Sequence, residues 1–213
     1  MDYVWTILPA LWKGFQLSLI FFGLSLIIAL PLGFLVALLR ISRFAPLRII
    51  VQIYIWVFRG TPLLLQLFYI YLALPFVGIQ FSREVAAVVT LVLNYTAYLA
   101  EIYRSGIQSI DRGQYEAAEV LGLSKLQTTT KIILPQMIKR VLPPTSNEVI
   151  NLVKDTALTY TIGNIELLRT TRTYAIADFS MIPFAVATLF YLIFNGLLQL
   201  LFKWLEDRYD YYR

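Results

Sequence analysis

Two sets of polar side chains recur at helical spacing inside apolar stretches of this sequence. Within each set the members lie three or four positions apart, so that each set falls on one face of a helix. The sets are Asn94, Tyr98 and Glu101, and Glu148, Asn151 and Asp155. Carboxylates on such faces can bind a cationic group or exchange a proton with a substrate. The pattern therefore indicates a polar site between two helices.

The residue types that are absent from the sequence exclude several kinds of catalytic and metal-binding site. The chain contains no histidine and no cysteine, which excludes imidazole as a metal ligand or general base and excludes thiolate catalysis. It has no glycine-rich phosphate loop followed by Lys-Ser or Lys-Thr, so another chain must hydrolyse any nucleotide. We expect no metal or cofactor in this chain. An intramembrane enzyme that uses Glu101 and Glu148 as acid and base is one alternative.

A further candidate site is a break at Arg59-Gly60-Thr61-Pro62 inside an apolar run. Proline removes a helical hydrogen bond and biases Thr61 away from helical angles, while Gly60 allows a ligand to approach the backbone. Thr61 and Pro62 suit the cap and first position of a new half-helix, whose positive end attracts a carboxylate. Arg59 either assists that binding or neutralises an acidic neighbour. A packing kink is the alternative.

The elements that must hold these residues are membrane helices. Hydrophobic residues make up 59% of the chain and charged residues only 15%, and the mean hydropathy is +0.69. Four apolar runs are long enough to cross a hydrocarbon core of about 30 Å. They cover residues 14–39, 49–74, 84–103 and 182–204. We expect an all-α membrane protein with one domain over residues 1–213, and no removable signal peptide before the first span.

The orientation follows from the basic residues, which are retained on the cytoplasmic side of a membrane. They gather after the first span, after the third span and in the tail, and all three regions are placed in the cytoplasm. These residues are Arg40, Arg43, Arg48, Arg104, Arg112, Lys125, Lys131, Lys139, Arg140, Lys203, Arg208 and Arg213. With the first connector, the segment after the third span and the tail all on the cytoplasmic side, the chain must cross the membrane once more between the third and the last apolar run. We therefore expect a polar fourth span at about 138–160, five spans in total, and an N-terminus outside. The alternative is an extramembrane loop at 138–160 with the tail outside.

The cytoplasmic segment after the third span is too polar to cross a membrane and is predicted to form two short helices. Asp111 caps the first helix, which stops at Gly122. Ser124 and Gln127 have the spacing of a capping box at the start of the second helix. Pro135 is expected to end that second helix. The product is a compact helix, turn, helix.

The first of these helices carries Ala117 and Ala118 between Glu116 and Glu119, so another protein surface can approach its backbone. This pattern, followed by Gly122 and by Ile133-Leu134-Pro135, resembles the EAA loop of permeases of binding-protein-dependent ABC importers. Further motifs cover most of the chain and resemble the polar amino-acid uptake branch of that family. They are Phe58-Arg59-Gly60-Thr61-Pro62-Leu63 with Gln66, Tyr98 to Arg104, and Lys154-Asp155-Thr156-Ala157-Leu158.

The resemblance implies a type I ABC importer transmembrane-domain fold, in which the EAA loop at residues 107–136 carries a coupling helix. It implies a permease dimer, with itself or a close paralogue, in the inner or plasma membrane of a prokaryote. It also implies ATP-binding subunits that hold ATP and Mg, and an extracytoplasmic amino-acid-binding protein. The implied coupling residues are Tyr115, Glu116, Ala117, Ala118, Glu119, Leu121 and Gly122.

An amino-acid cargo would give the membrane-embedded carboxylates a partner. An unpaired ionised group near the bilayer centre costs about 2.5–3.5 kcal/mol, so these groups need a partner or water. The carboxylate of the cargo would bind at the start of the half-helix, and the ammonium group of the cargo would bind one acidic side chain. The negative charge that remains favours a basic amino acid. The expected substrate-binding residues are Arg59, Gly60, Thr61, Pro62, Asn94, Tyr98, Glu101, Glu148, Asn151 and Asp155.

Two alternatives stay open for these residues and for the function. Glu101 can instead form a structural ion pair with Arg104, and Asp155 with Lys154 or Arg172. The rival function is an ion-gradient-driven secondary transporter or channel that needs no ATPase. An odd number of spans without visible inverted repeats argues against that rival.

Overall fold

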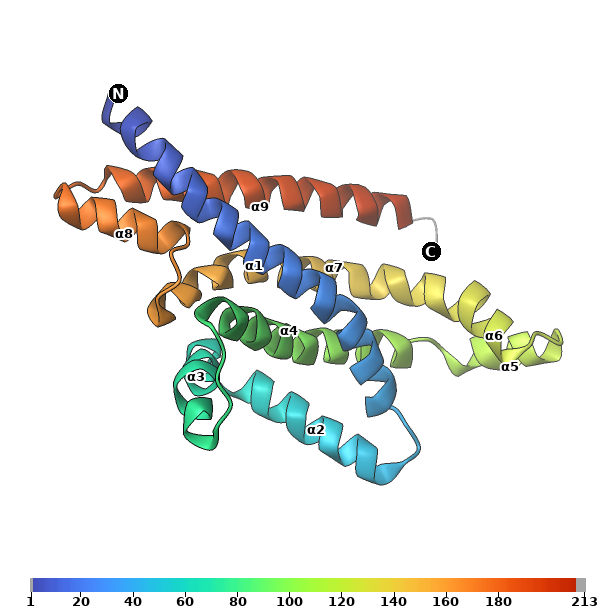
Figure 1. Ribbon diagram of the computed structural model, residues 1–213. Helices are drawn as coiled ribbons and strands as arrows, with labels where there is room; N and C mark the ends of the chain where they lie inside the picture. Colours follow the sequence, from blue (N-terminus) through green and yellow to red (C-terminus); the bar gives the residue numbers. More distant parts are fainter. Residues whose placement is uncertain (1, 210–213) are drawn as a thin grey trace.

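The computed structural model describes residues 2–209, and in this part of the chain every regular element is helical (Figure 1). The α-helices are α1 (Asp2–Arg40), α2 (Ala45–Gly60), α3 (Leu63–Phe68), α4 (Arg83–Gln108), α5 (Arg112–Val120), α6 (Lys125–Gln127), α7 (Leu134–Asp155), α8 (Leu167–Ala177) and α9 (Ile182–Tyr209). The π-helical segments are η1 (Tyr69–Ala73) and η3 (Thr128–Ile133). The 3-10 segments are η2 (Leu74–Val77) and η4 (Thr156–Ile162). Arg213, expected in the cytoplasmic tail, lies outside the described residues.

The long helices lie alongside one another, and the chain reverses direction from α1 to α2, to α4, to α7 and to α9 (Figure 1). Helix α1 packs against α4, and α7 packs against both α4 and α9. The core between these helices includes Phe21, Leu91 and Leu152, which are at most 1% exposed. A Cβ atom at Gly106 of α4 would overlap Cγ1 of Val141, so glycine allows α4 and α7 to meet closely there.

Three of the described helices, α1, α4 and α9, are long and apolar enough to cross a membrane. They contain the spans expected at 14–39, 84–103 and 182–204, and each helix extends beyond the expected bounds. Helix α1 is the longest, with 39 residues. Helix α8 is an additional element that the hydropathy pattern did not predict, because it is short and amphipathic.

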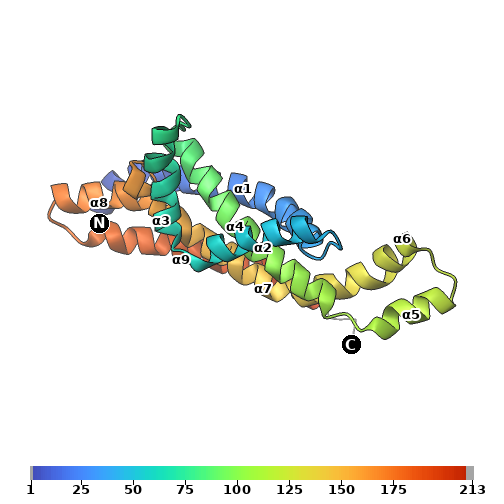
Figure 2. The same cartoon turned by 90° about the horizontal axis from the view of Figure 1, so that it is seen from below.

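The apolar run at 49–74 does not form one continuous span. Helix α2 and the helical segment Leu63–Val77 meet at an angle of 109°, and Figure 2 shows α3 turning away from the line of α2. Thr61 leaves the helix with φ −121° and ψ 148°, as predicted for the residue before a proline. The N-cap of α3 is Pro62 rather than Thr61, because Pro62 also has an extended ψ of 136°.

The polar stretch at 138–160 is helical throughout, since α7 continues directly into η4. The expectation that Pro135 ends a helix is wrong, because the helical path runs unbroken from Lys125 through η3 into α7. The segment η3 is π-helical, and its wider turn displaces the carbonyl groups with which a proline ring collides in an α-helix. Proline is therefore tolerated in the first turn of α7.

The helices α5 and α6 form a hairpin that projects from one end of the bundle (Figures 1 and 2). The predicted caps are confirmed: the Asp111 carboxylate accepts a hydrogen bond from Gly113 N, and Gly122 has φ +72°. Ser124 and Gln127 form both hydrogen bonds of a capping box. Local sequence signals thus determine the form of this hairpin.

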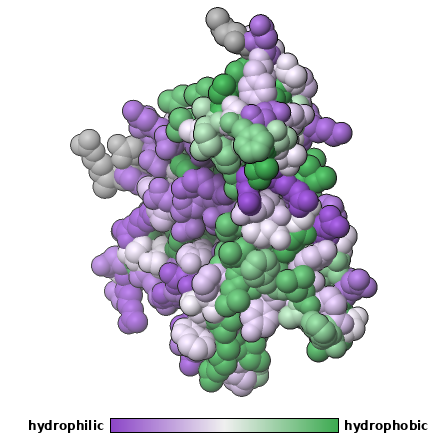
Figure 3. Space-filling view, turned by 90° about the vertical axis from the view of Figure 1, so that its left-hand side faces the viewer, coloured by the Kyte–Doolittle hydropathy of each residue, from purple (hydrophilic) through white to green (hydrophobic). Residues whose placement is uncertain are grey.

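Large apolar side chains remain exposed along the flanks of the bundle, among them Ile27 of α1, Trp56 of α2 and Leu200 of α9. Figure 3 looks onto the end that carries α8 and shows hydrophilic residues across its middle, with hydrophobic residues above and below. Flanks of this kind suit contact with lipid or with another membrane helix rather than with water.

Candidate functional site

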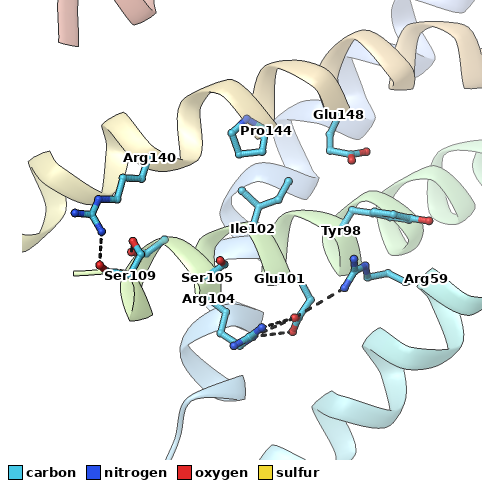
Figure 4. Close-up of a pocket in the computed structure, with 11 residues that line it drawn as sticks. Arg59, Tyr98, Glu101, Ile102, Arg104, Ser105, Ser109, Arg140, Pro144 and Glu148 are labelled. Atoms are coloured by element: carbon cyan, nitrogen blue, oxygen red, sulfur yellow. Dashed lines mark hydrogen bonds and ion pairs between the residues drawn. The ribbon is translucent and has the colours of Figure 1, made fainter. Parts of the chain in front are cut away.

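Two adjoining cavities lie where the break between α2 and α3 faces α4 and α7. The first, here called the acidic cavity, has a volume of about 430 Å³. It is lined by Thr61, Leu63, Asn94, Tyr95, Tyr98, Glu148, Asn151, Lys154 and Asp155. The second, here called the arginine cavity, has a volume of about 460 Å³ (Figure 4). It is lined by Arg59, Tyr98, Glu101, Ile102, Arg104, Ser105, Gly106, Ser109, Arg140, Pro144 and Glu148.

The two cavities differ in formal charge. Two carboxylates and one ammonium group line the acidic cavity, which gives it a net charge of −1. Three guanidinium groups and two carboxylates line the arginine cavity, which gives it a net charge of +1. Tyr98 and Glu148 belong to both linings, so these two side chains stand between the cavities. The formal charge of the lining therefore changes sign from one cavity to the other.

The acidic cavity contains two carboxylates and one cationic side chain, that of Lys154. The hydroxyl of Tyr95 on α4 donates a hydrogen bond of 2.7 Å to Oδ2 of Asp155 on α7. The alternative pairing of Asp155 with Arg172 is not formed, because the Arg172 guanidinium lies 4.9 Å from the ring centre of Tyr160. A tyrosine hydroxyl orients Asp155 without neutralising its charge, so this carboxylate can still attract a cation.

The break beside the acidic cavity is stabilised by the buried side chain of Gln66. Its Nε2 donates to the carbonyl oxygens of Phe58 at 2.8 Å and Thr61 at 3.0 Å. Its Oε1 accepts a 2.9 Å hydrogen bond from Nδ2 of Asn94, which also donates to the Phe58 carbonyl at 3.2 Å. Gln66 and Asn94 thereby supply donors to backbone groups released by the break. Asn94 lines the cavity, but its amide donor is already used inside the protein.

In the arginine cavity, Glu101 is the centre of an ion cluster. Nη2 of Arg104 lies 2.7 Å from Oε2 of Glu101, and Nε of Arg104 donates to Oε1 at 3.0 Å. Arg40 of α1 and Arg59 of α2 each approach the same carboxylate to 3.9 Å. Figure 4 shows Arg59 and Arg104 both directed at Glu101. Glu101 therefore forms the structural ion pair with Arg104 that was considered above as an alternative. Its negative charge is compensated by arginines from α1, α2 and α4.

The structure brings six of the ten predicted site residues together in the acidic cavity. They are Thr61, Asn94, Tyr98, Glu148, Asn151 and Asp155. Arg59 and Glu101 line the arginine cavity, while Gly60 and Pro62 line neither cavity and instead shape the break.

Sequence reasoning missed two polar residues of the acidic cavity, Tyr95 and Lys154. Each lies three residues from a predicted member of its own helix, Tyr95 from Tyr98 and Lys154 from Asn151. The same helical spacing rule, applied to a wider face, would have found both residues.

The projecting hairpin presents an acidic and apolar surface. Ala117, Glu116 and Glu119 are exposed, whereas Ala118 is buried, so only one of the two alanines faces outward. Val120 and Leu121 are 87% and 77% exposed. Val120 was not among the predicted residues, although an exposed valine beside a helix end is a signal for a contact surface. The hairpin therefore exposes two apolar side chains beside two carboxylates.

Comparisons with known proteins agree on one family. The arginine transport system permease ArtQ of Bacillus subtilis is 38% identical over 212 residues, which cover 98% of this chain and 97% of that protein. A GlnP permease protein of Rickettsia conorii, whose name refers to glutamine transport, is 35% identical over 198 residues, 92% of this chain and 91% of that protein.

A solved structure described as an amino acid ABC transporter with histidines superposes with a TM-score of 0.89. It is 32% identical to this chain, and the match covers 97% of both chains. The inward-facing MetNI methionine ABC transporter, at 20% identity, superposes with a TM-score of 0.74 over 99% of both chains, which shows likeness of fold alone.

The family model for binding-protein-dependent transport system inner membrane components matches residues 29–211. Its members are permease subunits that do not themselves hydrolyse ATP, because the ATPase is a separate subunit. Membership of a family of membrane permeases agrees with the all-helical fold, the apolar helices and the projecting hairpin. The chain therefore belongs to the family of binding-protein-dependent transport system inner membrane components and has the type I ABC importer permease fold.

Proposed function

We propose that this chain forms the translocation pathway of an ATP-driven importer for cationic amino acids. The observation that carries the proposal is the acidic cavity, in which Glu148, Lys154 and Asp155 of α7 line a volume of about 430 Å³. Lys154 suits the cargo carboxylate and one acidic side chain suits its ammonium group. The second acidic side chain then meets a cationic side chain of the cargo. Of the two relatives described above, ArtQ is named for arginine transport and GlnP for glutamine transport, and the charge of the acidic cavity is the reason to favour a cationic cargo.

We further propose five membrane crossings, formed by α1, by α2 with the bent segment after it, by α4, by α7 with η4, and by α9. The alternating direction of these helices supports this count (Figure 1). A polar α7 is tolerable because four of its charged side chains line cavities instead of facing lipid, namely Arg140, Glu148, Lys154 and Asp155. The N-terminus lies outside and the α5–α6 hairpin in the cytoplasm of a prokaryotic cell, on the side favoured by the basic residues.

The partners follow from the family and from the hairpin surface. Two permease chains, identical or paralogous, pair in the membrane, receive cargo from an extracytoplasmic binding protein, and each docks an ATP-binding subunit that holds ATP and Mg. Tyr115, Glu116, Ala117, Glu119, Leu121 and Gly122 form or shape the docking surface, with Ala118 packed beneath it. Closure of the ATPases draws the two hairpins together and tilts α4 and α7, which opens the cavities outward; hydrolysis resets them.

Ligand binding to the assembled complex tests the cargo class. We expect labelled arginine to bind more tightly than labelled glutamine, and Glu148→Gln or Asp155→Asn to weaken arginine binding by about tenfold or more. Glu84→Gln is the matched control, because Glu84 is exposed and lines neither cavity. Equal or tighter binding of glutamine, unaffected by both cavity variants, would assign the cavity to a neutral amino acid.

The absence of cysteine from the chain permits a direct test of orientation and docking. Ala117→Cys should react with a membrane-impermeant thiol reagent only from the cytoplasmic side, and Phe179→Cys, in the exposed turn before α9, only from outside. Labelling of both residues from one side contradicts the five-span arrangement. Gly122→Val, which strains a left-handed position, should reduce uptake and ATPase assembly together.

A further inference from the structure

The arginine cavity is not needed to hold the cargo in the proposed function. It nevertheless adjoins the acidic cavity through Tyr98 and Glu148, and it lies nearer to the α5–α6 end of α4, since its lining continues to Ser109. A cargo that leaves the acidic cavity toward that end and passes Tyr98 and Glu148 enters the arginine cavity. The side chains of this second cavity are therefore candidates for a role in release.

The three arginines of this cavity differ in how far their donors are used. Arg104 forms hydrogen bonds with Glu101 and with Gln108, and Arg140 donates to the backbone carbonyl of Ser109. Arg59 lies 3.9 Å from the Glu101 carboxylate, which is beyond hydrogen-bond distance, and its side chain is 43% exposed. Within the described part of the chain, Arg59 makes no hydrogen bond through its guanidinium group. Its N–H donors are available to a ligand.

Arg59 is also held at the boundary between the two cavities. Its guanidinium carbon lies 5.3 Å from the ring centre of Tyr98, one of the two side chains shared by both linings. A guanidinium group over an aromatic ring keeps its edge N–H groups free, and these match a carboxylate in a two-point contact. Arg59 thus places a guanidinium group beside Tyr98, between the acidic cavity and the arginine cavity.

We propose that the arginine cavity is a release station, in which Arg59 binds the carboxylate of the amino acid after it leaves the acidic cavity. This inference rests on the proposed function. The change in net charge from −1 to +1 between the cavities turns the cargo, so that its carboxylate leads and its cationic end follows. Because the second cavity repels the cationic end, it retains the cargo less tightly than the first and favours release.

The test compares transport rate with affinity in the complete complex, reconstituted in vesicles with its ATPase and supplied with radiolabelled arginine. For Arg59→Gln we expect the maximal uptake rate to fall about tenfold, while the dissociation constant for arginine changes by less than about twofold. The matched control is Arg172→Gln, which removes the guanidinium over Tyr160 and lines neither cavity. The control should retain normal rate and affinity.

Two results with Arg59→Gln overturn the release station: an uptake rate within twofold of the unmodified complex, or an affinity that falls as much as the rate. The latter would place Arg59 in the binding site itself. Failure of the unmodified complex to bind any cationic amino acid instead refutes the proposed function, and the release station with it.

A second measurement needs no variant and can still overturn the release station if Arg59→Gln does not assemble. Agmatine is arginine without its carboxylate, so at saturating concentration the unmodified complex should carry agmatine about tenfold more slowly than arginine. Equal maximal rates for agmatine and arginine overturn the release station.

Discussion

Two of the prolines that lie in or beside helical segments of this chain, Pro62 and Pro135, have opposite effects on the helical path. At Pro62 the path breaks and turns by 109°, whereas at Pro135 it continues from η3 into α7. At the first place Gln66 supplies donors to the carbonyl oxygens of Phe58 and Thr61. At the second, a π-helical turn changes the hydrogen-bond register ahead of the proline. The comparison teaches that the surroundings of a proline, and not the proline alone, determine whether a helix ends.

The largest expected effect comes from removing Gln66, which is buried and makes hydrogen bonds to both sides of the break. Gln66→Leu leaves the Thr61 carbonyl without its donor, the Phe58 carbonyl with only the donor of Asn94, and Asn94 without its acceptor, and we expect a loss of about 3 kcal/mol, or roughly 6–12 °C in melting temperature. Thermal unfolding of the detergent-solubilised complex measures it. Gln66→Glu is the matched variant, since it keeps the acceptor for Asn94 but not the donor; a near-normal melting temperature for both variants would contradict this account.

A smaller effect is expected for Asn94, which braces the same break from α4. Asn94→Leu removes the donors to Gln66 Oε1 and to the Phe58 carbonyl, at a cost of about 1–2 kcal/mol. Because the two residues share partners, the double variant with Gln66→Leu should lose less stability than the sum of the single losses. Strict additivity in a thermal-unfolding cycle would show that Asn94 acts independently of the break.

The smallest effect is expected at the second proline. Pro135→Ala restores a backbone N–H within a path that is already helical, so the melting temperature should change by less than roughly 3 °C and uptake should stay normal. The change in melting temperature of Pro135→Ala should be compared with that of Gln66→Leu in the same assay. A large loss of stability in Pro135→Ala would mean that this proline fixes the π-helical turn, and the comparison would need revision.

Much of the fold is readable from local sequence signals. The caps at Asp111, Gly122 and Ser124 were predicted because each depends on residues within one or two turns of the chain. The apolar spans were predicted because hydropathy is also a local property. The break at Thr61 and Pro62 was predicted from their types, but its angle was not, since Gln66 also contacts Asn94 of α4, which is 28 positions away in the sequence.

The candidate site was predicted less completely, for a physical reason. Helical spacing identifies residues that share a face, such as Glu148 and Asp155, but it does not tell which face of another helix they meet. The contact between Tyr95 and Asp155 joins residues 60 positions apart, and only the packing of α4 on α7 creates it. Likewise, Glu101 fits the spacing of a site residue, but the approach of α1 and α2 surrounds it with arginines.

The unbroken helical path from Lys125 to Asp155 has a mechanical consequence. The contact between Gly106 and Val141 divides this path into arms of 16 and 14 residues, or about 24 Å and 21 Å at 1.5 Å per residue. If this path moved as a rigid body about that contact, it would act as a lever with a central fulcrum. A sideways movement of the hairpin by a few ångströms would move Asp155 by nearly the same distance in the opposite direction, without amplification, so the ATPase would set the stroke at the cargo directly.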